Sequence, residues 1–234
     1  RLGTQSLDPA DTRPVIAKAF AAWTDVKCKD GTTAKMAFTE LEPIKCKKSE
    51  YNKDGPNVNV VLFQDNDWKY RGIDGTLAKT SVTYNDDTGE IYDADIEVNA
   101  ANNEVTIDDT DIEYDLQAIL THEVGHFIGI AHSARSDAVM YASYSPGSVS
   151  QRVLTDDDIA ALCEIYPSTY DAAGNTEPKN GYGPTCDDPE DDGGICAATP
   201  GARAGGGLSY GVATIFLGSG LWAARRRRRR RSAS

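Results

Sequence analysis

All three histidines of this 234-residue chain lie within the stretch THEVGHFIGIAHS, residues 121–133. His122 and His126 are four residues apart, a spacing that places two imidazoles on one face of a helix, with their Cβ atoms about 5–6 Å apart. Zinc binds nitrogen ligands at about 2.0–2.1 Å in a tetrahedral arrangement, and a catalytic zinc site keeps one position for water. The pair therefore predicts a zinc site on a helix.

The same stretch supplies a third ligand and a base. Gly129 can adopt the left-handed conformation that ends a helix and turns the chain, so that His132 approaches the same ion. Glu123 follows the first ligand and is placed to take a proton from a water at the metal. The alternative, three histidines satisfied in the core, is disfavoured because HExxHxxGxxH fixes five positions and uses every histidine of the chain.

Hydrophobic periodicity predicts the elements that position this stretch. A helix is expected over 11–26, capped by Asp11 or Thr12 and with Pro14 in its first turn. A helix from about Asp115 runs into the histidines. Another helix, over 154–166, is capped by Thr155 and has an aspartate, Asp158, at its third position, as in an imperfect capping box. Strands are expected over 35–42, 57–65, 75–84 and 90–99, and Pro167 ends the last helix.

Charge is distributed unevenly along the chain. The formal net charge is −12, and Arg225–Arg231 contribute seven positive charges, so residues 1–224 carry −12 − 7 = −19. An acidic body repels nucleic acid, and no nucleic-acid partner is expected. The first residues contain no apolar signal sequence, which is typical of a processed or truncated product.

Taken together, HEVGHFIGIAHS resembles the metzincin clan of zinc endopeptidases, and Ser133 after the third ligand is typical of its matrixin branch. Met140, in AVMYASY, is similar to the Met-turn that packs beneath the zinc. AFAAWTDV, AFTELEP and LTDDDIAALCEIYP are similar to matrixin elements, so the resemblance covers about residues 8–167.

The resemblance implies an α+β, zincin-like fold: a twisted, mostly parallel five-stranded sheet with an antiparallel edge strand, an active-site helix and a C-terminal helix. GTLAKTSVTY (75–84) would be the edge strand along which an extended peptide docks. Tyr141 and Tyr144 would line the pocket for the side chain after the cut bond. Gly129 and Met140 would support the site.

Two features depart from the animal matrixins. No histidine is left for their second, structural zinc, and the PRCGxPD switch of their propeptides is missing. Structural calcium around Asp93, Asp95 and Glu97 is one interpretation of those carboxylates, and ordinary edge-strand residues are the other.

Composition predicts three regions: a catalytic domain over 1–167, a flexible acidic Gly/Pro-rich linker over 168–204, and a tail over 205–234. The linker's acidic cluster, 187–192, is interpreted as a solvated spacer rather than a calcium site. Residues 205–224 are uncharged and just long enough to span a bilayer, and the following arginines favour a membrane segment with the protease outside. A low-complexity tail or a nucleic-acid tail are the alternatives.

Cys196, the apolar segment and the arginines together resemble the MYXO-CTERM sorting signals of myxobacteria, which implies processing near Cys196. The five cysteines have no CxxC spacing and predict two disulfides plus one spare, hence an oxidising compartment; free thiols in a cytosolic protein are the alternative. We expect Cys28–Cys46 and Cys163–Cys186 bridges. The rival pairing is Cys186–Cys196 with Cys163 free.

The sequence thus predicts a secreted or envelope-anchored, monomeric zinc endopeptidase acting on proteins or peptides, held to the membrane through its tail before processing. His122, His126 and His132 would bind the zinc and Glu123 would be the general base. A surface-binding module on the same scaffold, or a protease dedicated to its own propeptide or to one partner, are the competing hypotheses.

Overall fold

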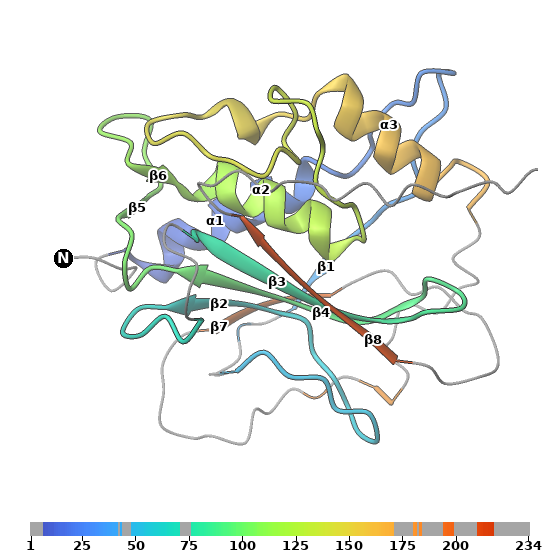
Figure 1. Ribbon diagram of the computed structural model, residues 1–234, viewed down its shortest axis with the longest axis horizontal. Coiled ribbons are helices and arrows are strands. Elements are labelled where there is room, and N and C mark those ends of the chain that lie inside the picture. Colours follow the sequence, from blue (N-terminus) through green and yellow to red (C-terminus); the bar gives the residue numbers. More distant parts are fainter. Residues whose placement is uncertain are drawn as a thin grey trace, which may run out of the picture.

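The computed structural model describes residues 7–41, 43, 48–70, 76–170, 180, 181, 183, 194–198 and 210–217. Three α-helices lie on one side of a sheet: α1 (Pro9–Ala21), α2 (Leu116–Phe127) and α3 (Asp156–Ile165) (Figure 1). A 3-10 turn, Ser150–Arg152, precedes α3. The helix–sheet arrangement matches the expected α+β class, and α2 carries the first two histidines.

The described strands form a six-stranded sheet in the order β1-β7-β2-β4-β3-β8. Their bounds are β1 Thr39–Glu40, β2 Val60–Gln64, β3 Ala78–Asn85, β4 Ile91–Asn99, β7 Gly194–Ala198 and β8 Tyr210–Leu217. Strands β5 (Val105–Thr106) and β6 (Tyr114–Asp115) form a separate parallel pair. The strands expected over 57–65, 75–84 and 90–99 are confirmed to within a few residues.

The sheet differs from the predicted five-stranded, mostly parallel one. Within the described residues, β2 and β4 are its one parallel pair, because β7 lies antiparallel between β1 and β2. Strand β8 pairs antiparallel with β3 along its whole length, from Ala78 opposite Leu217 to Asn85 opposite Tyr210. Strand β3 is antiparallel to β4, as expected. Because β8 pairs with its other side, β3 is not the edge of this sheet.

Both additional strands come from the stretch in which the sequence predicts a linker and a membrane or sorting segment. The backbone of Cys196 lies in β7, opposite Val60. No helix in the described part of the chain is long and apolar enough to cross a membrane.

The first helix begins earlier than predicted. Asp8 caps it by accepting a hydrogen bond from Ala10 N, and Pro9 occupies the first helical position, where a missing N–H costs nothing. Pro14 is therefore in the helix interior, so the assignment of Asp11 or Thr12 as the cap was wrong. The helix ends at Ala21, and Trp23 beyond it remains fully buried.

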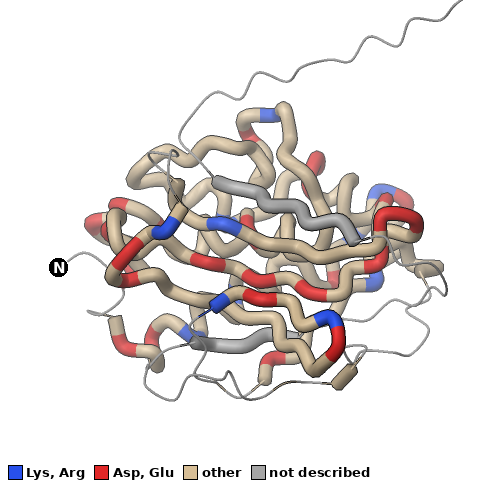
Figure 2. Tube along the Cα trace, turned by 60° about the horizontal axis from the view of Figure 1, so that its bottom comes forward, with Lys and Arg blue, Asp and Glu red and all other residues tan. Residues whose placement is uncertain are grey.

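Alternation along β3 separates an inner from an outer sheet face. The inner side chains, such as Ala78 and Val82, pack with α2 in the hydrophobic core. On the outer face Glu97 of β4 is fully buried and lies 3.0 Å from Lys69 Nζ and 3.6 Å from Lys79 Nζ. Figure 2 shows acidic positions along the strands on this side of the molecule.

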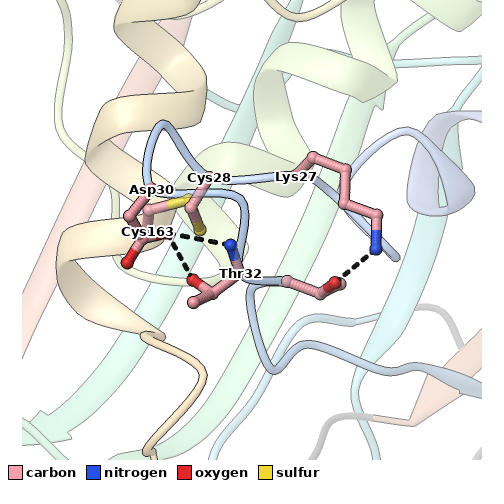
Figure 3. Close-up of a disulfide and its surroundings, with 6 residues drawn as sticks. Lys27, Cys28, Asp30, Thr32 and Cys163 are labelled. Carbon is pink, nitrogen blue, oxygen red and sulfur yellow. Dashed lines mark hydrogen bonds between the residues drawn. A yellow bond between two sulfur atoms is a disulfide. The ribbon is translucent and has the colours of Figure 1, made fainter.

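The disulfide pairing predicted from the sequence was wrong. Cys28, in the turn after α1, is bonded to Cys163 of α3 (Figure 3), so Cys163 is neither free nor paired with Cys186. A tight turn, with Cys28 N donating to Thr32 O and Gly31 at φ 83°, directs Cys28 back toward the helices. The expected partners Cys46 and Cys186 lie outside the described residues. Nearness in sequence did not predict nearness in space.

Candidate metal centre

Helix α2 starts from a cap that is fixed on several sides. Asp115 Oδ1 accepts from Ala118 N at 2.7 Å, which satisfies one of the free N–H groups of the first turn. Arg152 donates to both oxygens of the same carboxylate, at 2.8 and 2.5 Å. This bidentate contact to the buried Asp115 carboxylate fixes the start of the helix, about two turns before His122.

The ring nitrogens of His122 and His126 converge. Their Nε2 atoms are 3.0 Å apart, whereas their Nδ1 atoms lie 2.6 Å from Val139 O and 2.7 Å from Ile130 O. A carbonyl only accepts, so each Nδ1 carries the proton and each Nε2 presents a lone pair. Two tetrahedral ligands at about 2.0–2.1 Å from one zinc lie about 3.3 Å apart, close to this separation.

Burial lowers the pKa of both imidazoles, to about 3 for His122 and well below its usual value for His126. Both rings are therefore neutral near pH 7, and no proton is available between the facing Nε2 atoms. Two nitrogen lone pairs that face each other at this distance repel each other, and a cation between them removes that repulsion. Neutral imidazole is also the form of histidine that binds metal. The donor set fits zinc.

The third histidine reaches the cluster through a turn at Gly129. This residue has φ 89°, in the left-handed region, and Ile130 N donates back to Gly125 O at 2.8 Å. The turn also brings Ile130 O to the His126 ring. Beyond it the exposed His132 completes a set with His122 and His126 whose ligand atoms all lie within 4.8 Å of one another.

Met140 packs against the backbone of α2 between its two histidines. A Cβ at Gly125 would lie 2.2 Å from Met140 Sδ and 2.9 Å from Trp23 Cζ2, so only glycine leaves room for these side chains. Trp23 Nε1 also donates to Thr121 O at 2.9 Å, which ties the end of the α1 segment to the same helix.

Asp158 of α3 holds the Met140 segment. Its buried carboxylate accepts from Val139 N at 2.9 Å and Met140 N at 3.0 Å, and it also accepts from Thr155 N at 2.8 Å. The last contact is part of the capping arrangement predicted for α3. Since Val139 O in turn accepts from the His122 ring, α3 reaches the metal centre through one peptide unit.

Glu123 is fully buried beside His122, and its carboxylate is held on one side only. Oε2 accepts from Thr80 Oγ1 of β3 at 2.5 Å, while Oε1 has no hydrogen-bond partner among the described residues. Burial raises the pKa of Glu123 to about 8, and the Thr80 hydrogen bond opposes this rise. A buried carboxylate with one unpartnered oxygen is suited to hold a water.

With this geometry established, comparison with known proteins is decisive. The family model described as matrixin matches residues 2–167. The chain belongs to the matrixin family. Residues 2–167 thus match a metalloendopeptidase domain of the matrixin type, a zinc-dependent family, and the three histidines form a cluster that is able to bind a metal ion.

Individual matrixin relatives are distant. The chain is 24% identical to metalloendoproteinase 1-MMP of Arabidopsis thaliana over 164 residues, covering 68% of this chain and 39% of that protein. It is 26% identical to metalloendoproteinase 1 of Glycine max, covering 66% and 45%. For human neutrophil collagenase the values are 24% identity, 70% and 30%. The chain spans less than half the length of these curated relatives.

The two tyrosines expected to line the matrixin pocket have different surroundings. Tyr144 is buried, accepts from Asp115 N at 3.0 Å and donates to Ser148 O at 2.6 Å, so its hydroxyl supports the start of α2. Tyr141 is half-buried and lies beside Ser133 in an isolated parallel bridge, one residue from His132.

Sequence reasoning did not identify three residues of the matrixin site: Thr80, Gly125 and Asp158. Gly125 carried a signal, because a glycine in the interior of a helix is unfavourable unless something approaches closely. Asp158 was predicted only as part of a helix cap. Nothing in the sequence marked Thr80, since its partner is 43 residues away.

Proposed function

We propose that this matrixin domain hydrolyses peptide bonds of protein substrates, with zinc held by His122, His126 and His132 and with Glu123 as the general base. The observation that carries the proposal is the pair of facing, unprotonated Nε2 atoms beside a buried carboxylate with one unpartnered oxygen. A single water held near the zinc position would lie close to the histidine cluster and could donate a hydrogen bond to Glu123 Oε1.

When bound, zinc would polarise the substrate carbonyl and acidify a water. Glu123 Oε1 would orient the attacking water, take its proton and pass that proton to the departing amine nitrogen. The raised pKa of Glu123 suits both halves of this transfer, because a base near neutrality also serves as an acid.

An extended substrate would add to the free side of β3 by backbone hydrogen bonding. That side is the one β8 now covers, from Ala78 to Asn85. The proposal therefore requires β8 to leave β3 before a peptide docks. Tyr141, beside the third ligand, is the candidate for contact with the residue after the cut bond, and Tyr144 supports the wall behind it.

The remaining proposals concern setting. The Cys28–Cys163 bridge supports a secreted or surface location, because disulfides persist in oxidising compartments. Membrane attachment through residues 205–224 before processing near Cys196, and a monomeric state, rest on the sequence. Calcium is proposed at Asp93 and Asp95, since Asp93 Oδ1 is buried without a partner among the described residues, whereas Glu97 is already paired with lysines.

The decisive variant is Glu123→Ala in the full chain, with Glu104→Ala, an exposed carboxylate, as the matched control. Glu123→Ala should keep one zinc per chain and lose casein hydrolysis by about 10²- to 10⁴-fold. Glu104→Ala should retain both. A zinc chelator should abolish hydrolysis and added zinc should restore it. Full activity of Glu123→Ala would overturn the proposed mechanism.

A further inference from the structure

Thr80 lies outside the histidine motif but touches the general base. Its side chain is fully buried on the inner face of β3, and its hydroxyl donates to Glu123 Oε2 at 2.5 Å and approaches Glu123 O at 3.3 Å. A buried threonine with a purely structural role usually donates its hydroxyl hydrogen to a backbone carbonyl. Here the nearer acceptor is the carboxylate itself, and the bond is charge-assisted whenever Glu123 is ionised.

The two carboxylate oxygens are equivalent until something distinguishes them. Rotation about the last bond of a glutamate side chain is broad, so a free carboxylate would sample many orientations. By holding Oε2, the Thr80 hydroxyl leaves Oε1 as the acceptor for an incoming water. Oε1 is the oxygen without a partner among the described residues.

The donor is itself held rigidly. Strand β3 is paired with β4 from Ala78 to Tyr84, and Thr80 lies opposite Ile96 in that ladder. The neighbours Ala78 and Val82 on the same face carry no hydrogen-bonding group, so they offer no replacement donor. The sheet thus holds the hydroxyl in place, while the helix carries the carboxylate that the hydroxyl orients.

We propose that Thr80 is a positioning residue for Glu123, selecting through Oε2 the orientation in which Oε1 receives the reacting water. The Thr80 hydroxyl acts through Glu123 and is assigned no contact with substrate or metal. The inference rests on the proposed function, since it assigns a partner to the proposed base. It predicts that loss of the hydroxyl impairs turnover rather than zinc or substrate binding.

The test compares Thr80→Val and Thr80→Ser in the full chain, with Thr106→Val of β5 as the control, because the Thr106 hydroxyl has no hydrogen-bond partner among the described residues. Thr80→Val, a nearly isosteric change, should lower kcat about 10- to 100-fold, as expected for a lost hydrogen bond to a charged group. KM and the zinc content should not change. Thr80→Ser should stay within about threefold of the parent, and Thr106→Val should be unaffected.

A double-mutant cycle separates this role from a structural one. In the Glu123→Ala background, Thr80→Val should cause no further loss, because the group it positions is gone. If Thr80→Val folds poorly or loses zinc, Thr80→Ser is compared with Thr80→Ala instead. A kcat at least about tenfold higher for Thr80→Ser supports the positioning role, and equal kcat values for the two variants overturn it. Parental kcat in Thr80→Val, or an equal loss in both backgrounds, would also overturn it. An active Glu123→Ala variant would instead overturn the proposed function.

Discussion

Removing the Cys28–Cys163 bridge should destabilise the domain strongly. The bridge joins residues 135 positions apart. In the chain-entropy description, closing a loop of that length lowers the entropy of the unfolded chain by about 17 cal/mol/K, or about 5 kcal/mol at 25 °C. Native bridges usually contribute about 2–5 kcal/mol, so a loss within that range is expected for the Cys28→Ser/Cys163→Ser variant. This is a large part of the total stability of a typical domain.

The measurement is urea unfolding followed by tryptophan fluorescence, to which the buried Trp23 contributes, in matched buffers for the parent and the double variant. The unfolded variant should be more expanded, so the dependence on urea should also steepen. Ser136→Ala, an exposed residue outside the bridge, is the control and should leave the free energy of unfolding unchanged.

The consequence should extend to the metal centre. Cys163 lies in the same helix as Asp158, whose carboxylate holds Val139 and Met140. Loss of the bridge should therefore lower the temperature at which zinc is released along with the unfolding temperature. A change in unfolding free energy below about 1 kcal/mol, or a Cys28–Cys46 peptide after non-reducing digestion, would refute the reasoning.

Three further predictions follow from single contacts. Gly125→Ala should raise the intrinsic helix propensity yet destabilise the domain by about 1–3 kcal/mol and weaken zinc retention. The reason is that the new Cβ would lie 2.2 Å from Met140 Sδ and would push that side chain away. Urea unfolding and zinc analysis check this, and a stabilised variant would contradict it. Burial raises the pKa of Asp93 to about 7, so the folded state binds a proton that the unfolded state has lost above about pH 4, and stability falls as pH rises from about 4 to 7. Asp93→Asn should thus raise the unfolding free energy by about 2–4 kcal/mol at pH 8 and hardly at all at pH 4, measured with a calcium chelator present; an equal effect at both values would be inconsistent with this account. Removing residues 205–234, which include β8, should lower KM for a peptide substrate. If β8 is paired with β3 in about nine-tenths of the molecules, only about one-tenth can bind the peptide, so KM should fall about tenfold. An unchanged KM would show that β8 does not compete with the substrate.

Local patterns predicted those parts of the fold whose cause is local. The helical spacing of His122 and His126, the strand alternation of 90–99 and the capping carboxylate of α3 each depend on neighbours within a few residues. The start of α1 was missed for a similar local reason, since the Asp8–Pro9 pair is a complete start signal placed before the periodic segment.

Features that depend on distant partners could not be predicted in the same way. The bridge from Cys28 to Cys163, the pairing of β8 with β3 and the contact of Thr80 with Glu123 join residues between 43 and more than 130 positions apart. Each requires the sheet and helices to be assembled first. Composition assigned 194–198 to a linker and 210–217 to a tail. These segments are strands because their backbones pair with β2 and β3, which lie far away in the sequence, and local composition does not record those partners.

The histidine motif places His122 and His126 on α2 and His132 beyond its end, but other elements decide how the first two rings point. Val139 O and Ile130 O orient the two imidazoles, α3 holds Val139 through Asp158, and β3 holds Glu123 through Thr80. The proposed zinc ligands thus depend on the helix layer, whereas the proposed base depends on the sheet. Damage to α3 should therefore appear first as lost zinc, and damage at Thr80 as slow turnover with zinc retained, which makes the two supports separable by experiment.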